Sequence, residues 1–196
     1  MSEIKSEKNR LRAEYKIKRD EMSPEEKALS DRKICERFIS LASFRFADTL
    51  LMYHPLKGEV NVTPIAEEAL KLGKKVAYPK CNSVTSDMDF YFIKSLSELE
   101  KGAYGIYEPS ESNTKYDIKD KNAHTGTICL IPALVYDKCG YRIGYGKGYY
   151  DRYLAHFKGA KAGIVYGDFI IDNLPRGRFD LAVDYILSER GLSIIK

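Results

Sequence analysis

The sequence has no C-x-x-C cysteine pair and no histidines beside its cysteines in a zinc-binding spacing. Four scattered cysteines exclude a zinc ribbon, argue against a disulfide scaffold and fit a reducing compartment. Long apolar runs are missing too: residues 128–136 are interrupted by Pro132 and fall far short of the roughly 20 residues that span a bilayer. The first 19 residues lack the apolar centre of a secretory signal. We therefore expect a cytoplasmic protein.

Strong net charge is also absent, since 32 basic and 28 acidic residues leave the 196-residue chain at +4. The excess is concentrated: residues 4–19 hold seven basic and two acidic side chains and carry +5, so the remainder carries −1. Such a basic segment can serve a nucleic acid, an acidic membrane or a polyanionic small molecule. The chain is 44% hydrophobic, and its length suits a single globular domain over residues 1–196.

Short apolar runs alternate with helical patterns, which predicts an α/β layered fold with a mostly parallel central sheet flanked by helices. Ser23-Pro24-Glu25-Glu26 is a strong helix start with Ser23 as N-cap, followed by an apolar stripe that includes Leu29, Ile34 and Phe38. Further helices are expected over 4–19, 63–72, 95–101 and 149–157. Strands are expected over 49–53, 75–78, 88–93, 127–131, 162–166 and 182–187. A helical part (1–41) thus precedes an α/β body (48–196).

Residues 137–154, DKCGYRIGYGKGYYDRYL, hold four of the chain's 14 glycines. Glycine at this density weakens regular structure, but it lets the backbone approach a ligand and direct N–H groups at an anion. Arg142 and Lys147 add charge, and the tyrosines offer flat faces to a heteroaromatic ring. The segment is neither a Walker A loop, because Gly148 follows Lys147, nor a dinucleotide fingerprint, because Tyr149 replaces the third glycine. A glycine-rich hairpin with tyrosines packed at its base is the alternative.

Residues 141–152, YRIGYGKGYYDR, resemble the signature of the 5-formyltetrahydrofolate cyclo-ligase family, the methenyltetrahydrofolate synthetases. Weaker matches follow the family's order: KNRLR at 8–12, HPLKGEV at 54–60, GIYEP at 105–109 and LIPALVYD at 130–137. The resemblance implies conversion of 5-formyltetrahydrofolate to 5,10-methenyltetrahydrofolate with ATP and Mg²⁺, releasing ADP and phosphate. It also implies the NagB/RpiA/CoA-transferase-like fold and a role in one-carbon metabolism.

Carried over by position, the resemblance implies ATP contacts in two segments: Lys8, Asn9, Arg10, Leu11, Arg12, Arg142, Ile143, Gly144, Tyr145, Gly146, Lys147, Gly148, Tyr149 and Tyr150. It implies folate contacts at His54, Glu59 and residues 145–149, and catalytic roles for Arg142, Lys147 and Tyr149. From the residues alone, Lys8 and Arg12 share a helix face that could equally be solvated. Glu59 could equally be a surface-loop acid, and His54 a structural residue.

Asp151, beside the glycine-rich segment, is the best metal candidate, because Mg²⁺ takes one or two carboxylates plus phosphate oxygens and waters. Its alternative role is that of an acid complementing a helix dipole. Asp184 matches the family's second metal position, although Asp180 is an equally plausible carboxylate from the residues alone.

The candidate site residues include no Ser-His or Cys-His pair that would indicate a protein nucleophile. This absence fits phosphoryl activation of the formyl oxygen followed by attack of N10. Two other functions stay open on the residues alone. One is a nucleic-acid-binding module using the basic helix, against which the −1 of the remaining chain argues. The other is a different ATP-dependent small-molecule phosphotransferase. We expect small-molecule substrates, no nucleic acid or membrane partner, and a monomer.

Overall fold

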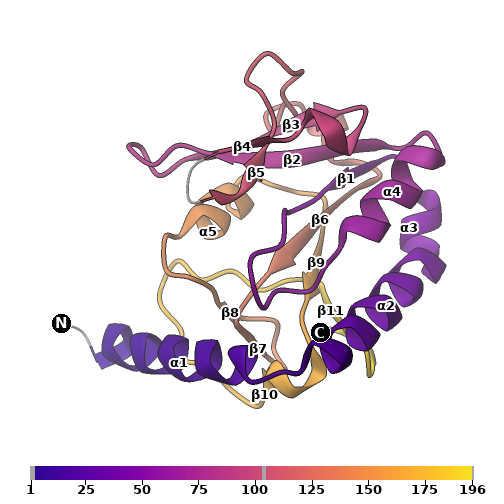
Figure 1. Ribbon diagram of the computed structural model, residues 1–196. Coiled ribbons are helices and arrows are strands. Elements are labelled where there is room, and N and C mark those ends of the chain that lie inside the picture. Colours follow the sequence, from indigo (N-terminus) through magenta and orange to yellow (C-terminus); the bar gives the residue numbers. More distant parts are fainter. Residues whose placement is uncertain (1–2, 103–104, 196) are drawn as a thin grey trace.

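The computed structural model describes residues 3–102 and 105–195, and seven of their strands form one central sheet (Figure 1). These strands are β1 (Thr49–Leu51), β2 (Lys75–Cys81), β3 (Met88–Ile93), β6 (Thr127–Pro132), β9 (Ala160–Ile164), β11 (Tyr185–Ser188) and β12 (Gly191–Ile194). Their order across the sheet is β12-β11-β9-β6-β1-β2-β3. The five inner strands run parallel, and the edge strands β12 and β3 are antiparallel to their neighbours. The predicted mostly parallel α/β fold is confirmed.

The helices lie in two places (Figure 1). Three of them, α2 (Pro24–Ser40), α3 (Ala42–Phe46) and α4 (Thr63–Lys71), lie on one side of the sheet, whereas α1 (Glu3–Asp20) contacts β8 (Arg142–Ile143) in a smaller sheet. The capping box predicted for α2 is present: Ser23 Oγ accepts the Glu26 N–H at 3.2 Å, and the Glu26 carboxylate accepts the Ser23 N–H. The prediction of the apolar stripe of α2 is partly wrong, because Leu29 is 44% exposed and Cys35 is buried instead.

Two smaller sheets and several single-turn helices complete the fold. The strand order β10 (Ile170–Ile171), β7 (Val135–Asp137), β8 forms one sheet, and β4 (Glu100–Lys101) pairs with β5 (Tyr107–Glu108) in the other. The 3₁₀ turns are η1 (Leu96–Glu98), η3 (Lys121–His124) and η4 (Gly167–Phe169). The helix α5 (Tyr149–Leu154) ends before residue 157.

The helix predicted over 95–101 is wrong. A capping box between Ser95 and Glu98 starts a turn there, but Leu99 is extended and the chain enters β4. Pairing with β5 takes over at this point, so a tertiary partner overrides the local helix signal.

The central strand β1 lies at a reversal of the chain's path across the sheet. It pairs with β2 on one side and with β6 on the other, and all three strands are parallel. In open α/β sheets, ligands bind in the crevice outside the carboxyl ends of the strands at such a switch point. We therefore expect the segments that follow β1 and β6 to line a ligand-binding site.

Within 3–102 and 105–195, no helix is both long enough and apolar enough to cross a membrane.

Candidate active site

A cavity of about 460 Å³ opens where the switch point predicts it, at the carboxyl ends of β1, β2 and β6. Its walls come from α1, from the segment after β1, from the β2–β3 and β5 region and from the glycine-rich loop. The cavity brings together most of the residues singled out in the sequence: Lys8, Arg12, His54, Glu59, Arg142 and residues 144–151. Asn9, Arg10, Leu11, Ile143 and Asp184 do not line it.

Lys8 and Arg12 form one basic wall, because they lie one turn apart on the inward face of α1. Lys8 Nζ forms an ion pair with Asp180, while Arg12 Nε donates to the Gly144 carbonyl at 3.0 Å. Arg12 Nη1 also donates to Asn9 Oδ1 at 2.6 Å. The contacts with Asp180 and Gly144 bridge segments far apart in sequence, so α1 is held against the loop. The solvated-face alternative fits neither residue.

The residues between Lys8 and Arg12 face other surroundings. Arg10 forms ion pairs with Glu7 at 2.7 Å and with Glu14 at 3.0 Å on the outer face of α1. Leu11 is buried in the hydrophobic core. Helical geometry thus divides the KNRLR segment between the cavity, the solvent and the core.

The buried carboxylate of Asp137 organises the start of the glycine-rich loop. Its Oδ1 accepts the N–H groups of Cys139 at 2.9 Å and Tyr141 at 3.0 Å. Its Oδ2 accepts the Leu174 N–H at 3.1 Å and Arg176 Nη2 at 3.2 Å. Four donors on one fully buried side chain satisfy its charge and fix the turn that leads into β8 and the loop.

Gly146 is required where the loop meets α1. Its φ is +91°, and a Cβ there would lie 3.1 Å from both Cζ and Nε of Arg12. The Arg12 guanidinium therefore packs directly on the glycine backbone. A Cβ at this position would push the guanidinium by a few tenths of an ångström.

Arg142 and Asp151 form an ion pair at the inner end of the loop, with 2.7 Å between Nη2 and Oδ1. The Arg142 side chain is 5% exposed and also donates from Nη1 to the Leu181 carbonyl at 2.9 Å. The Asp151 side chain is 32% exposed. The buried arginine thus holds the carboxylate from behind, and the carboxylate remains accessible from the cavity.

The two carboxylates that the sequence left open as second metal ligand lie in different surroundings. Asp180 lines the cavity beside Lys8. Asp184 lies outside it, and its carboxylate accepts the Lys161 N–H at 2.7 Å and pairs with Lys161 Nζ at 3.0 Å. Among the residues described here, no group of three or more His, Cys, Asp or Glu side chains converges on a metal position.

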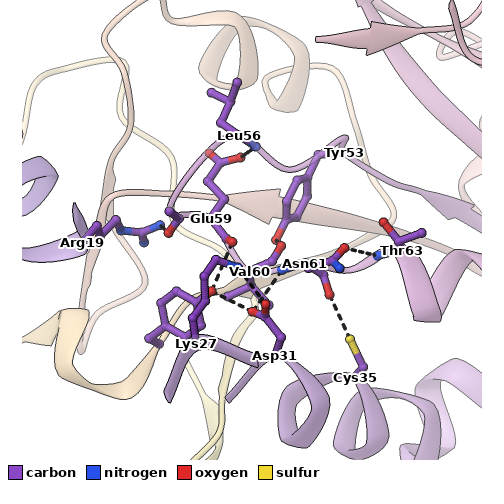
Figure 2. A network of polar contacts seen from close by, with 12 residues as sticks. Arg19, Lys27, Asp31, Cys35, Tyr53, Leu56, Glu59, Val60, Asn61 and Thr63 are labelled. Carbon is purple, nitrogen blue, oxygen red and sulfur yellow. Dashed lines mark hydrogen bonds and ion pairs between the residues drawn. The ribbon is translucent and has the colours of Figure 1, made fainter. Parts of the chain in front are cut away.

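Glu59 is buried, at 4% exposure, and is not a surface-loop acid. Its Oε2 accepts the Leu56 N–H at 2.8 Å, and the preceding Gly58 has a φ of +83° that turns the loop inward (Figure 2). Burial raises the pKa of the Glu59 carboxyl, and the positive charge of Arg19 opposes that rise. His54 is half-buried, and its ring centroid lies 5.1 Å from that of Tyr107.

Sequence reasoning missed two charged residues of this region. Arg19, one of the seven basic side chains of residues 4–19, was not singled out from the sequence, yet it is 5% exposed. Glu108 lines the cavity as a second buried carboxyl, and burial raises its pKa. Arg19 could have been found, because Leu11, Tyr15 and Arg19 follow each other at intervals of four and form one buried stripe.

The phenol of Tyr150 is a third feature that only the fold reveals. Its Oη is buried at the cavity, and it has no hydrogen-bond partner among the described residues. Buried polar atoms without partners are rare in folded proteins, and each calls for an explanation. A polar ligand in the cavity supplies one.

The chain is similar to proteins of one known family. The model of the 5-formyltetrahydrofolate cyclo-ligase family matches residues 4–189. A 5-formyltetrahydrofolate cyclo-ligase of Mus musculus is 28% identical over 197 residues and covers 95% of both chains. One from Mycoplasma pneumoniae is 30% identical over 191 residues, with 93% of this chain and 99% of the relative covered.

Solved structures agree as well. The structure of a 5,10-methenyltetrahydrofolate synthetase from Aquifex aeolicus has a TM-score of 0.84 and 33% identity, covering 96% of this chain and 93% of the other. That of a 5,10-methenyltetrahydrofolate synthetase from Mycoplasma pneumoniae has a TM-score of 0.73 and 28% identity, covering 93% and 98%.

Proposed function

Since the chain belongs to the 5-formyltetrahydrofolate cyclo-ligase family, whose activity is ATP-dependent, we propose that the cavity at the ends of β1 and β6 is its active site. There, 5-formyltetrahydrofolate is cyclised to 5,10-methenyltetrahydrofolate, and ATP is converted to ADP and phosphate. One observation carries this assignment: a single cavity joins a basic wall, a glycine-rich loop and a buried carboxylate.

The nucleotide phosphates would lie between α1 and the glycine-rich loop. Lys8 and Arg12 face this space with positive charge, and Gly146 lets Arg12 approach the loop backbone closely. Lys8 would exchange its partner Asp180 for a phosphate oxygen. Charge-assisted contacts of this kind are about twice as strong as neutral hydrogen bonds.

The folate would lie on the other side of the cavity, with its pterin at Glu59. The Glu59 carboxylate is held by the Leu56 N–H through Oε2, and a carboxylate can accept two N–H groups side by side, as the pterin amino group and adjacent ring nitrogen present them. Tyr145 and Tyr149 line the same space and offer flat faces. The phenol of Tyr150 would find its hydrogen-bond partner on the bound substrate.

The donor set of the cavity fits Mg²⁺ accompanying ATP. This ion keeps several waters and takes one or two carboxylates plus phosphate oxygens, and Asp151 and Asp180 supply two carboxylates without a dedicated protein cage among the described residues. Asp151 and Asp180 would hold it, whereas Asp184, the second metal position that the resemblance implied, lies outside the cavity and is paired with Lys161. When bound, the ion would neutralise charge on the phosphates.

In the proposed reaction, the formamide oxygen of the substrate attacks the γ-phosphorus of ATP, and the bond from that phosphorus to the bridging oxygen breaks, releasing ADP. N10 then bonds to the formyl carbon and loses its proton, while the carbon–oxygen bond breaks and its electron pair leaves with phosphate. Phosphate is a good leaving group where hydroxide is not. The chain's residues orient both substrates and balance charge, which is the main source of catalysis in phosphoryl transfer.

Three residues have proposed roles in this step. Lys147, at the cavity, would balance charge on the transferred group, and Tyr149 would orient the substrate. Arg142 would act on the reacting region through Asp151, which it holds at 2.7 Å. No protein nucleophile is needed.

The test is direct. Purified protein is mixed with 5-formyltetrahydrofolate, Mg²⁺ and ATP, and the methenyl product is followed by its near-ultraviolet absorbance. We expect an increase that requires ATP. No increase from a folded preparation would overturn the assignment.

We further propose that the chain acts as one cyclo-ligase domain, as a monomer in the cytoplasm, without nucleic-acid or membrane partners. Size-exclusion chromatography with light scattering tests whether the protein is a monomer. A salt-dependent gel shift with DNA or RNA would show that it does bind nucleic acid and would contradict this proposal.

A further inference from the structure

Arg19, at the carboxyl-terminal end of α1, is a buried cation whose described hydrogen bonds all go to backbone carbonyls. Its guanidinium carbon also lies 5.0 Å from the ring centroid of Phe169 and 5.8 Å from that of Tyr166. Its Nη1 donates to the Gly58 carbonyl at 2.6 Å and its Nε to the Leu134 carbonyl at 3.2 Å, and its Nη2 donates to the Ala133 carbonyl. Gly58 belongs to the segment after β1, and Ala133 and Leu134 to the segment after β6. One guanidinium therefore joins the two segments that flank the switch point.

The carbonyl that Arg19 holds belongs to Gly58, the residue directly before Glu59 in the chain. The positive charges of Arg19 and Lys27 act on the Glu59 carboxylate. The charge of Arg19 also acts on the phenols of Tyr53 and Tyr145. Lys27 is already paired with Asp31 at 2.7 Å, whereas Arg19 has no carboxylate in its hydrogen bonds among the described residues. No carboxylate of the described chain neutralises its charge directly, and part of that charge acts on Glu59.

A buried arginine without a paired carboxylate is costly unless its charge and donors are used. The planar guanidinium reaches three carbonyls in different directions, which the compact ammonium of lysine cannot do. Packing alone would be served by an apolar side chain. This position therefore requires both the planar guanidinium, which reaches three carbonyls, and its positive charge.

We propose that Arg19 is a positioning residue for the folate: it fixes Gly58, and so the Glu59 that follows it, against the segment after β6 and thereby holds the Glu59 carboxylate in place for the pterin. This inference rests on the proposed function, in which Glu59 binds the pterin. Because Lys8 and Arg12 lie on the same helix, α1 then holds residues for both substrates.

The experiment measures dissociation constants for 5-formyltetrahydrofolate and for Mg-ATP separately, by calorimetry on the full chain. Arg19→Met removes both the branched guanidinium and its charge, whereas Arg19→Lys keeps the charge. Lys18→Met, which removes a 48% exposed cation from the outer face of the same helix, is the control. We expect Arg19→Met to weaken folate binding about tenfold or more, the scale of one charge-assisted hydrogen bond, and ATP binding less than about threefold. Arg19→Lys should fall between Met and the parent, and Lys18→Met should change neither constant.

The double variant Arg19→Met/Glu59→Gln shows whether Arg19 acts through Glu59. If it does, Arg19→Met has little further effect on folate binding once Glu59 is glutamine. An equal loss with and without Glu59, or an equal loss for folate and ATP, would mean general structural support and would overturn the inference. If Arg19→Met does not fold, Arg19→Lys in both backgrounds makes the same comparison.

A failure of the proposed function has a different signature. If Glu59→Gln alone binds folate as tightly as the parent, Glu59 does not bind the pterin, and the inference falls with that role. If Glu59→Gln weakens folate binding but neither Arg19 variant does, only the positioning role of Arg19 is refuted.

Discussion

Replacing Gly146 with alanine should weaken ATP binding far more than a comparable glycine replacement outside the cavity. Gly146 has a φ of +91°, and the new Cβ would lie 3.1 Å from Cζ and Nε of Arg12. Two penalties follow from this geometry. The first acts on the fold through the backbone, and the second acts on the cavity through Arg12.

The backbone penalty is modest. A non-glycine residue in the left-handed region costs about 1–2 kcal/mol, which lowers the unfolding midpoint of a domain this size by about 2–8 °C. The cavity penalty concerns the Arg12 guanidinium, which the new Cβ would push by a few tenths of an ångström. This shift strains the hydrogen bond that Nε donates to the Gly144 carbonyl at 3.0 Å and moves the guanidinium relative to a bound phosphate. A hydrogen bond to a charged group is worth about 1.5–3 kcal/mol, so a misplaced Arg12 should raise the ATP dissociation constant by roughly 10- to 100-fold.

Gly73→Ala is the matched control. Gly73 follows α4 with a φ of +74°, a Cβ added to it would meet no described atom within 4 Å, and it does not line the cavity. Both variants should lose similar thermal stability, measured by circular dichroism, but only Gly146→Ala should lose affinity for Mg-ATP in calorimetry. Equal ATP affinities in the two variants would refute the placement of ATP between Arg12 and the loop.

Three further predictions concern the other walls of the cavity. Asp151→Asn should lower turnover by about 10²–10³-fold, the scale seen when one charge-stabilising group is removed, and should raise the Mg²⁺ requirement. It should also lower the unfolding midpoint, because the buried Arg142 guanidinium loses its ion-pair partner. Full activity with unchanged Mg²⁺ dependence would contradict a metal role. Because burial raises the pKa of Glu59, its carboxylate is lost at a higher pH than in an exposed glutamate, so folate affinity should fall on mild acidification; calorimetry across pH should find this acid limb absent in Glu59→Gln. Tyr150→Phe removes a buried hydroxyl without a partner among the described residues, so thermal stability should stay equal or rise while substrate affinity falls; unchanged affinities would mean that the phenol meets no substrate.

Features encoded by neighbours in sequence could be predicted well. The capping box of Ser23 and Glu26 forms as expected, because its partners are three residues apart and need no tertiary contact. The alternation of apolar runs and helical segments is likewise enough for a mostly parallel α/β sheet. The local helix signal fails where strand pairing competes with it, as at residues 95–101, where η1 is short and β4 pairs with β5.

The same distinction between local sequence signals and tertiary contacts holds for the candidate site. The sequence by itself determined the residue types of the site: the basic face of α1, the glycines of the loop, and the carboxylates at 59 and 151. Only the tertiary structure decided that Glu59 and Arg19 are buried together and that Asp180 rather than Asp184 lines the cavity. The reason is physical: burial, pKa and pairing depend on what chain segments more than 100 residues away bring to the same place, as Leu134 does for Arg19.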